Sequence, residues 1–206
     1  MRPEWCPDLT GARVLIVASG PSAKEVPMEE AKGKAFVVAI NESWRLCRWA
    51  DMLYACDGTW WKKRNGVPEF TGLRVSQDAT ARNNFPAVRH VRCVRGVNRL
   101  VMDRDDYIGD GRTSLFQIIN LAAHAGPPRV IGMVGADMRL DYGVHWHGPH
   151  EAGLNNPRAK TIEMWREHID GIADDLAALG ITVLNLSPVS ALKNYRKATL
   201  QEFLAA

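Results

Sequence analysis

Three histidines within six residues, His145, His147 and His150, form the densest group of side chains in this chain that could do chemistry. An imidazole titrates near neutral pH, so one of them could act as a general base. Alternatively, His145 and His147 alternate along an extended segment and could bind a transition metal with His150, with Asp137 or Asp141 completing the set. The sequence leaves both interpretations open, beside that of an inert loop.

A second group of candidates comes directly after predicted strands. The apolar runs 13–18, 36–40, 52–56 and 130–134 each end at small or polar residues. In open α/β sheets, ligands bind just beyond the carboxyl ends of the strands, near the point where the strand order reverses. The pattern therefore predicts a ligand crevice lined by Ser19, Gly20, Pro21, Ser22, Asn41, Asp57, Gly135 and Asp137.

Two predicted helix starts add anion-binding capacity to this crevice. One follows Ser19–Ser22, and the other begins after Arg112 and Thr113, at Ser114. The free N–H groups at a helix start attract anions, and a guanidinium strengthens that attraction. Thr113 alone would satisfy the helix as its N-cap, so Arg112 indicates a binding role. The first turn matches neither the GxGxxG nor the P-loop pattern, which disfavours those nucleotide families.

Asp57 is the carboxylate best placed for binding, because it follows the strand 52–56. It could hold a ribose hydroxyl or a Mg²⁺ ion. Asn41 is equally well explained as a turn residue or as a nucleotide contact. Trp60 and Trp61 could stack on a ring or pack in the core.

The elements that must position these residues alternate between strands and helices. Further strands are predicted at 73–76, 88–94 and 181–186, and helices at 23–31, 42–49, 59–64, 114–125 and 160–179, with a helical tail opening at 187–190. This alternation predicts an α/β fold of Rossmann-like type, with a mostly parallel sheet flanked by helices. Residues 1–206 are expected to form a single nucleotide-binding domain with a short C-terminal helical tail.

The composition is that of an ordinary globular protein, with 46% hydrophobic and 24% charged residues. A formal net charge of +3 does not argue for nucleic acid. The arginine-rich stretch 82–104 is better explained as a solvated face than as a polyanion-binding patch, which leaves nucleic acid as a weakly supported partner. Four scattered cysteines predict free thiols. With no leader and no apolar run long enough for a membrane span, a cytoplasmic location is expected.

Taken in order, these short motifs resemble the bacterial lipooligosaccharide sialyltransferase family. The resemblance extends from about residue 13 to 195 and includes the segments 20–22, 112–114, 135–137 and 187–192, Asn41 and the histidine loop. It implies a Rossmann-like sheet, a CMP-sugar donor, no metal and a histidine base. Position by position, it implies that Gly20 and Ser22 flank the donor phosphate, and that Asn41 contacts the nucleotide. Thr113 and Ser114 would lie near the cytidine or the transferred group, with Arg112 beside them.

The same resemblance assigns the catalytic residues. His150, or else His147, would take the acceptor proton, and Tyr142 would face the leaving phosphate. The sequence departs from this family at Asp57, where the family has Asn. A carboxylate suits a nucleotide phosphate poorly unless a cation lies between them.

Two further resemblances give alternatives. The 20–22 turn and the segment from His145 to Gly148 are also similar to archaeal-type 6-hydroxymethylpterin diphosphokinases, which use ATP and Mg²⁺; Asp57 and Asp137 would then hold the metal. The run 39–61 and the histidine loop resemble phage-encoded proteins of unknown function, which would work in the host cytoplasm.

We therefore expect a transferase with a nucleotide-activated donor, namely a nucleotide-sugar-dependent glycosyltransferase that needs no cofactor. The alternatives are a Mg²⁺-dependent pyrophosphokinase and a non-catalytic phage nucleotide-binding accessory protein. The acceptor stays open among sugar, nucleobase, DNA and protein hydroxyls.

Overall fold

Short runs rich in β-branched and apolar residues form most strands of a central eight-stranded sheet. In this computed structural model, which describes residues 3–104 and 106–206, the strand order is β10-β9-β8-β1-β2-β3-β4-β5 and all paired strands are parallel. The strands are β1 (Arg13–Val17), β2 (Phe36–Ile40), β3 (Met52–Tyr54), β4 (Leu73–Ser76), β5 (Val88–His90), β8 (Val130–Val134), β9 (Thr182–Asn185) and β10 (Arg196–Lys197). The predicted fold class is confirmed.

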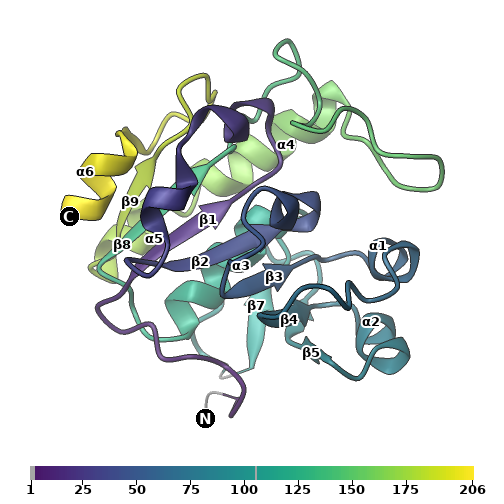
Figure 1. Cartoon of the computed structure of the whole chain (residues 1–206). Helices are drawn as coiled ribbons and strands as arrows, with labels where there is room; N and C mark the ends of the chain where they lie inside the picture. Colours follow the sequence, from purple (N-terminus) through teal and green to yellow (C-terminus); the bar gives the residue numbers. More distant parts are fainter. Residues whose placement is uncertain (1–2, 105) are drawn as a thin grey trace.

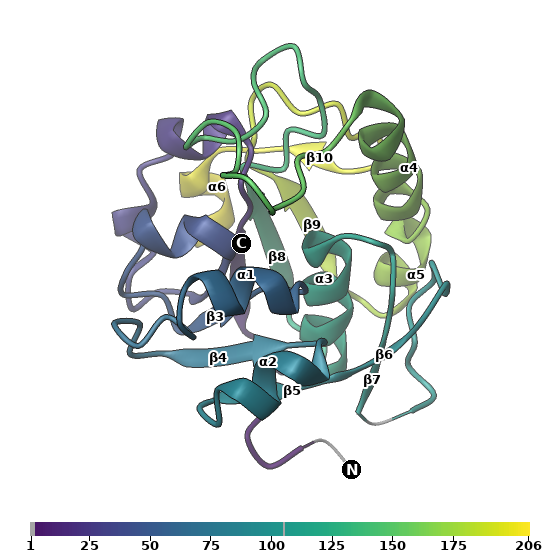
Figure 2. The same ribbon diagram turned by 90° about the vertical axis from the view of Figure 1, so that its right-hand side faces the viewer.

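Both faces of this sheet are buried, because successive strand residues point to opposite faces. Val14 and Ile16 pack with α3 (Ser114–His124), α4 (Ala159–Asp170) and α5 (Ala173–Ala178) on one face. Leu15 and Val17 pack on the other face with short helices. These are η1 (Pro21–Glu25), η2 (Met28–Ala31), η3 (Asn41–Arg45), α1 (Gly58–Lys63) and α6 (Leu200–Ala205). The two helical layers are seen in Figures 1 and 2.

The strand order reverses at β1, which lies between β2 and β8. From β1 the chain adds β2, β3, β4 and β5 on one side, and it later adds β8, β9 and β10 on the other. The helices after β1 pack on one face of the sheet and those after β8 on the other, which is the arrangement that leaves a crevice at the carboxyl edge.

Three predicted helices differ from the structure. The segment 23–31 forms two 3₁₀ helices, η1 and η2, because Pro27 holds the preceding Val26 in extended backbone (φ −97°, ψ 127°). The segment 42–49 forms only the 3₁₀ helix η3. The predicted helix 160–179 breaks at Gly171 and Ile172 into α4 and α5, where the Asp170 carboxylate accepts the backbone N–H of Lys193 at 3.1 Å.

The predicted strand 88–94 also divides. Val88–His90 joins the main sheet as β5, whereas β6 (Arg92–Val94) pairs in parallel with β7 (Tyr107–Gly109) in a separate small sheet. The strands β7 and β10 and the helix α2 (Ala79–Asn84) were not predicted.

The helical tail does not open at 187–190. The hydroxyls of Ser187 and Ser190 bond instead to the backbone of Ala136, and the tail helix α6 begins only at Leu200, where Thr199 and Glu202 form a capping box.

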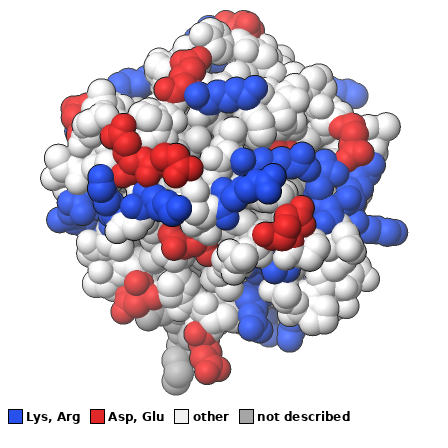
Figure 3. Space-filling model, in the orientation of Figure 1, with Lys and Arg blue, Asp and Glu red and all other residues white. Residues whose placement is uncertain are grey.

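Two bulk expectations have structural counterparts. Cys47, Cys56 and Cys93 are free thiols. Within the described residues, no helix is long and apolar enough to cross a membrane. Acidic and basic side chains are mixed over much of the face shown in Figure 3, with basic ones gathered at its right-hand side.

Candidate functional site

A pocket of about 270 Å³ lies at the carboxyl edge of the sheet, where the turns after β1, β2, β3 and β8 meet the start of α3. Most of the predicted site residues contribute to its wall: Ser19, Gly20, Asn41, Asp57, Arg112, Thr113, Ser114, Gly135, Asp137 and His150. Pro21, Ser22, Tyr142 and His147 lie outside the wall. The predicted crevice is thus present, and strand-end residues far apart in the sequence converge on it.

The turn after β1 lies against the turn after β8. Gly20 has an ordinary φ of −63°, but a Cβ there would come within 2.5 Å of the Gly135 carbonyl oxygen. The Gly20 N–H also donates to that carbonyl at 2.8 Å. Glycine is therefore required at this position for contact between two turns of the chain, whatever the pocket holds.

Ser22 and Asp137 satisfy one another in the interior. The Asp137 carboxylate accepts the Ser22 N–H at 2.9 Å and also the Ser22 hydroxyl, and both residues are almost fully buried. The Asp137 carboxylate therefore occupies the anion position at this helix start. A ligand phosphate at this turn would meet Ser19 and Gly20 rather than the donors of Ser22.

The start of α3 offers its donors to the pocket. Thr113 is the N-cap residue, as predicted, but its side chain makes no capping hydrogen bond. The Thr113 side chain is instead buried in the pocket wall. Arg112 precedes it on the exposed surface. This eleven-residue helix therefore has an uncapped start beside a guanidinium, and both features favour the binding of an anion.

Left-handed backbone occurs at three non-glycine wall residues, Asn41 (φ 49°), Arg112 (φ 56°) and Met138 (φ 49°). Asn tolerates this conformation, whereas Arg and Met adopt it at a cost of about 1–3 kcal/mol each. Such conformations gather at binding and catalytic sites, and here they aim residues from three different turns at one pocket.

Asp57 has a structural task as well as a place in the wall. It is the N-cap of α1, and its Oδ1 accepts the Thr59 N–H at 2.8 Å. Asp137 has both oxygens engaged by Ser22. Among the described residues these two carboxylates belong to no group of three or more metal-ligating side chains.

The histidines lie in the loop between β8 and α4. The centre of the His145 ring lies 5.1 Å from that of His147 and 4.4 Å from that of His150. His145 and His150 line the pocket, with His147 next to them. Burial, together with the neighbouring His150 and His147 rings, lowers the pKa of His145 to about 3. Burial also lowers the pKa of His147 and of His150, so all three rings are neutral at pH 7.

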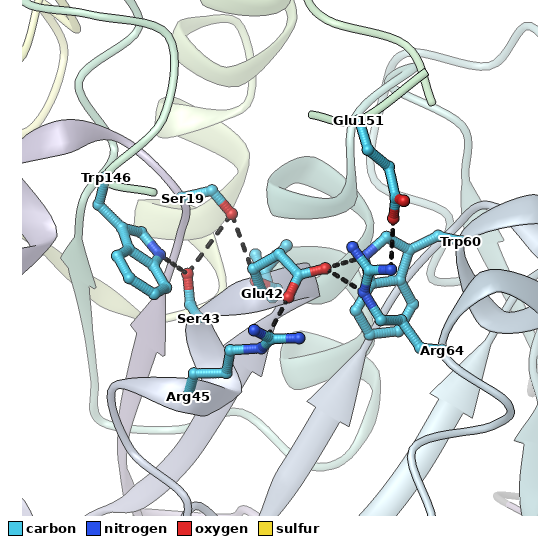
Figure 4. Close-up of polar contacts among 9 residues, drawn as sticks. Ser19, Glu42, Ser43, Arg45, Trp60, Arg64, Trp146 and Glu151 are labelled. Atoms are coloured by element: carbon cyan, nitrogen blue, oxygen red, sulfur yellow. Dashed lines mark hydrogen bonds and ion pairs between the residues drawn. The ribbon is translucent and has the colours of Figure 1, made fainter. Parts of the chain in front are cut away.

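Trp146 attaches the histidine loop to the turn after β1 (Figure 4). Its backbone N–H donates to the Ser19 carbonyl at 2.9 Å, and its indole N–H donates to the Ser43 hydroxyl at 3.2 Å. That hydroxyl donates in turn to the Ala18 carbonyl at 2.9 Å. The rings on either side of Trp146 are therefore held against the sheet.

Glu42, a buried carboxylate that the sequence analysis did not single out, lies at the centre of a second set of contacts (Figure 4). It accepts the Trp60 indole N–H at 3.0 Å and the Arg64 Nε–H at 2.6 Å, and it pairs with Arg45 at 3.0 Å. Arg64 also donates to Glu151 at 2.5 Å. Because Glu151 follows His150, this pair connects the histidine loop to α1.

Further wall residues were not predicted. Trp165 of α4 has a buried indole N–H with no hydrogen-bond partner among the described residues, and Arg139 and Asn155 come from the histidine loop. By the helical period of the sequence, Trp165 falls on the same stripe as Ile162 and Ile169, which are buried. The sequence could not show that this stripe reaches a pocket, because that depends on where the histidine loop lies in the fold.

No protein-family profile matches this chain, and no curated protein matches it in sequence. Its fold, however, is found among solved structures. The sialyltransferase CstII, solved with a trisaccharide acceptor and CMP, aligns with a TM-score of 0.54 at 13% identity over 91% of this chain and 86% of that one. The chain shares the fold of a sialyltransferase.

Two other CstII structures agree. The Campylobacter jejuni enzyme in complex with CMP aligns with a TM-score of 0.50 at 12% identity, covering 92% of this chain and 86% of that one. A point mutant of this α-2,3/8-sialyltransferase gives 0.51 at 12% identity, covering 91% and 86%. At such identities the likeness shows the fold alone.

Proposed function

We propose that this protein is a transferase whose donor is a nucleotide-activated sugar, with a CMP-sugar as the favoured donor. The observation that carries the proposal is the pocket at the strand-order reversal, whose polar end is the uncapped start of α3 beside Arg112. The shared fold supports it, because CstII was solved with CMP and a trisaccharide acceptor.

The wall divides into regions that suit the parts of such a donor. The phosphate would lie at Thr113, Ser114 and Arg112, where helix N–H groups and a positive charge meet. The nucleoside would lie toward Asn41 and Asp57. The unpartnered indole N–H of Trp165, elsewhere in the wall, is a donor for ligand oxygens.

Transfer would need one proton acceptor in the wall, and His150 provides it. The acceptor hydroxyl oxygen attacks the anomeric carbon, the bond from that carbon to the phosphate oxygen breaks, and the nucleotide leaves with the bonding electrons. The hydroxyl proton passes to the neutral imidazole. Tyr142 is 50% exposed and outside the wall, so its proposed contact with the leaving phosphate requires the loop to move.

The test separates binding from turnover. Without divalent metal, His150→Ala should keep its affinity for CMP in calorimetry and lose about 10²–10⁴-fold in the rate of CMP release from a CMP-sugar. His90→Ala is the matched control, because His90 lies outside the wall and bonds the Gln77 carbonyl. Equal rates in His150→Ala and wild type would remove His150 from the mechanism.

A Mg²⁺-dependent pyrophosphokinase is the second candidate, favoured by the presence of Asp57 and Asp137 in one wall. In that reaction the two carboxylates would hold the metal that bridges the phosphates of ATP. A non-catalytic accessory protein would instead bind a nucleotide tightly and never release a product.

A further inference from the structure

We infer that His145, His147 and His150 form a binding site for a divalent transition metal of the Zn²⁺ class. One potential ligand atom from each ring lies within 4.8 Å of the other two. This is the only such group of three or more His, Cys, Asp or Glu residues in the part of the chain that the structure describes. The inference goes beyond the proposed transfer reaction and does not depend on it.

Unsatisfied ring nitrogens are the observation that points to a ligand. His145 Nε2, His147 Nε2 and His150 Nδ1 are buried and have no hydrogen-bond partner among the described residues. Buried polar groups are almost always bonded, so three orphaned nitrogens on adjacent rings are an unusual accumulation. The indole of Trp146, on the same loop, has its partner in Ser43. A single cation shared by the three rings would satisfy them together.

Three imidazole nitrogens as ligands determine which class of metal would bind. Imidazole suits Zn²⁺, Cu²⁺, Fe²⁺ and Ni²⁺, whereas Mg²⁺ and Ca²⁺ prefer oxygen. Zn–N bonds of about 2.0–2.1 Å in a tetrahedron put the nitrogens roughly 3.3 Å apart, so the ring nitrogens need to approach one another by at most about 1.5 Å.

Three protein ligands leave a fourth position on a tetrahedral ion. Because His145 and His150 line the pocket, the ion would lie at its wall. An imidazole that gives its lone pair to a metal keeps its proton on the other nitrogen. Coordinated His150 could not accept the proton of an acceptor hydroxyl, so the transfer reaction that we propose belongs to the metal-free protein.

The test is a Co²⁺ titration of the metal-free full-length protein, followed by visible absorption. We expect one Co²⁺ per chain with tetrahedral d–d bands, displaced by one equivalent of Zn²⁺. His147→Ala should weaken Co²⁺ binding by tenfold or more, since even loss of an outer-shell partner costs about 10–100-fold. His90→Ala, which removes a histidine on β5, should bind as wild type does. Weak binding at several equivalents, or equal binding by His147→Ala, would overturn the inference.

A second measurement covers the case in which His147→Ala fails to fold. Stoichiometric Zn²⁺ should raise the melting temperature of the wild-type protein, and a chelator should reverse the rise; no rise at saturating Zn²⁺ overturns the inference. The outcome for nucleotides is separate. Tight Co²⁺ binding without CMP binding would uphold the metal site and reject the proposed function, and the reverse result would do the opposite.

Discussion

Asp57 belongs to the pocket wall and also caps α1, and this double position makes one substitution decisive. Asn caps a helix about as well as Asp, so Asp57→Asn should leave the fold intact. In a metal-free transferase the change should alter turnover by only a fewfold. In a Mg²⁺-dependent pyrophosphokinase it removes a metal ligand, and activity should collapse. Steady-state rates with and without Mg²⁺ distinguish the two.

Asp78 provides the matched control for this substitution. It caps α2 through the Thr80 N–H at 2.8 Å, as Asp57 caps α1, and it lies outside the pocket wall. Asp78→Asn should therefore leave turnover unchanged. A severe loss in Asp57→Asn alone would reject the metal-free mechanism.

For single residues, the sequence predicted where a side chain lies in the fold better than which groups it bonds. Position at a strand end was enough to place Asn41, Asp57 and Asp137 in one wall. It could not show that both carboxylate oxygens of Asp137 accept hydrogen bonds from Ser22, because the two residues are 115 positions apart. Glu42 was missed for a related reason: a charged residue in a polar turn gives no sign of burial until Trp60 and Arg64 pack over it.

At the scale of elements, two ion pairs of Arg64 connect α1 to its surroundings, and we expect them to contribute unequally to stability. Arg64 bonds Glu42, whose side chain is 4% exposed, and Glu151, whose side chain is 51% exposed. Glu151→Gln should leave the free energy of unfolding nearly unchanged, because exposed pairs are screened by water. Arg64→Gln should cost roughly 1.5–3 kcal/mol, because it removes a charged partner from a buried carboxylate. Urea unfolding of both variants measures the difference, and equal costs would contradict this account.

The accuracy of the helix predictions followed the strength of each helix's own signals. The segment 114–125 has an unbroken apolar period and a clear stop at Gly126, and it forms α3 as Ser114–His124. The period of 160–179 was equally clear, but it continues in phase across Gly171, where α4 ends and the Asp170 carboxylate accepts the Lys193 N–H. The short helices before β2 and β3 became 3₁₀ turns, since four or five residues have too little length for the α-helical period to decide.

At the scale of the whole molecule, the pocket lies between segments from the two helical layers of the fold. One wall comes from the turns after β1, β2 and β3, and the other from α3, α4 and the histidine loop after β8. A ligand held between them would contact segments from residue 18 to residue 165, so its binding energy should add to the stability of the whole fold.

Ligand-induced stabilisation therefore tests the proposed donor at this scale. A ligand at 100 times its dissociation constant adds about 2.7 kcal/mol, which for a chain of this size raises the melting temperature by roughly 5–11 °C. We expect such a shift with CMP or a CMP-sugar in the absence of metal, and a smaller one with UDP or ATP. Melting curves for CMP, CTP, UDP, UDP-sugars, CMP-sugar and ATP, each with and without Mg²⁺, make the comparison. A shift produced only by ATP with Mg²⁺ would reject the sugar donor and favour pyrophosphoryl transfer, because only that reaction needs a metal to bridge the phosphates across Asp57 and Asp137.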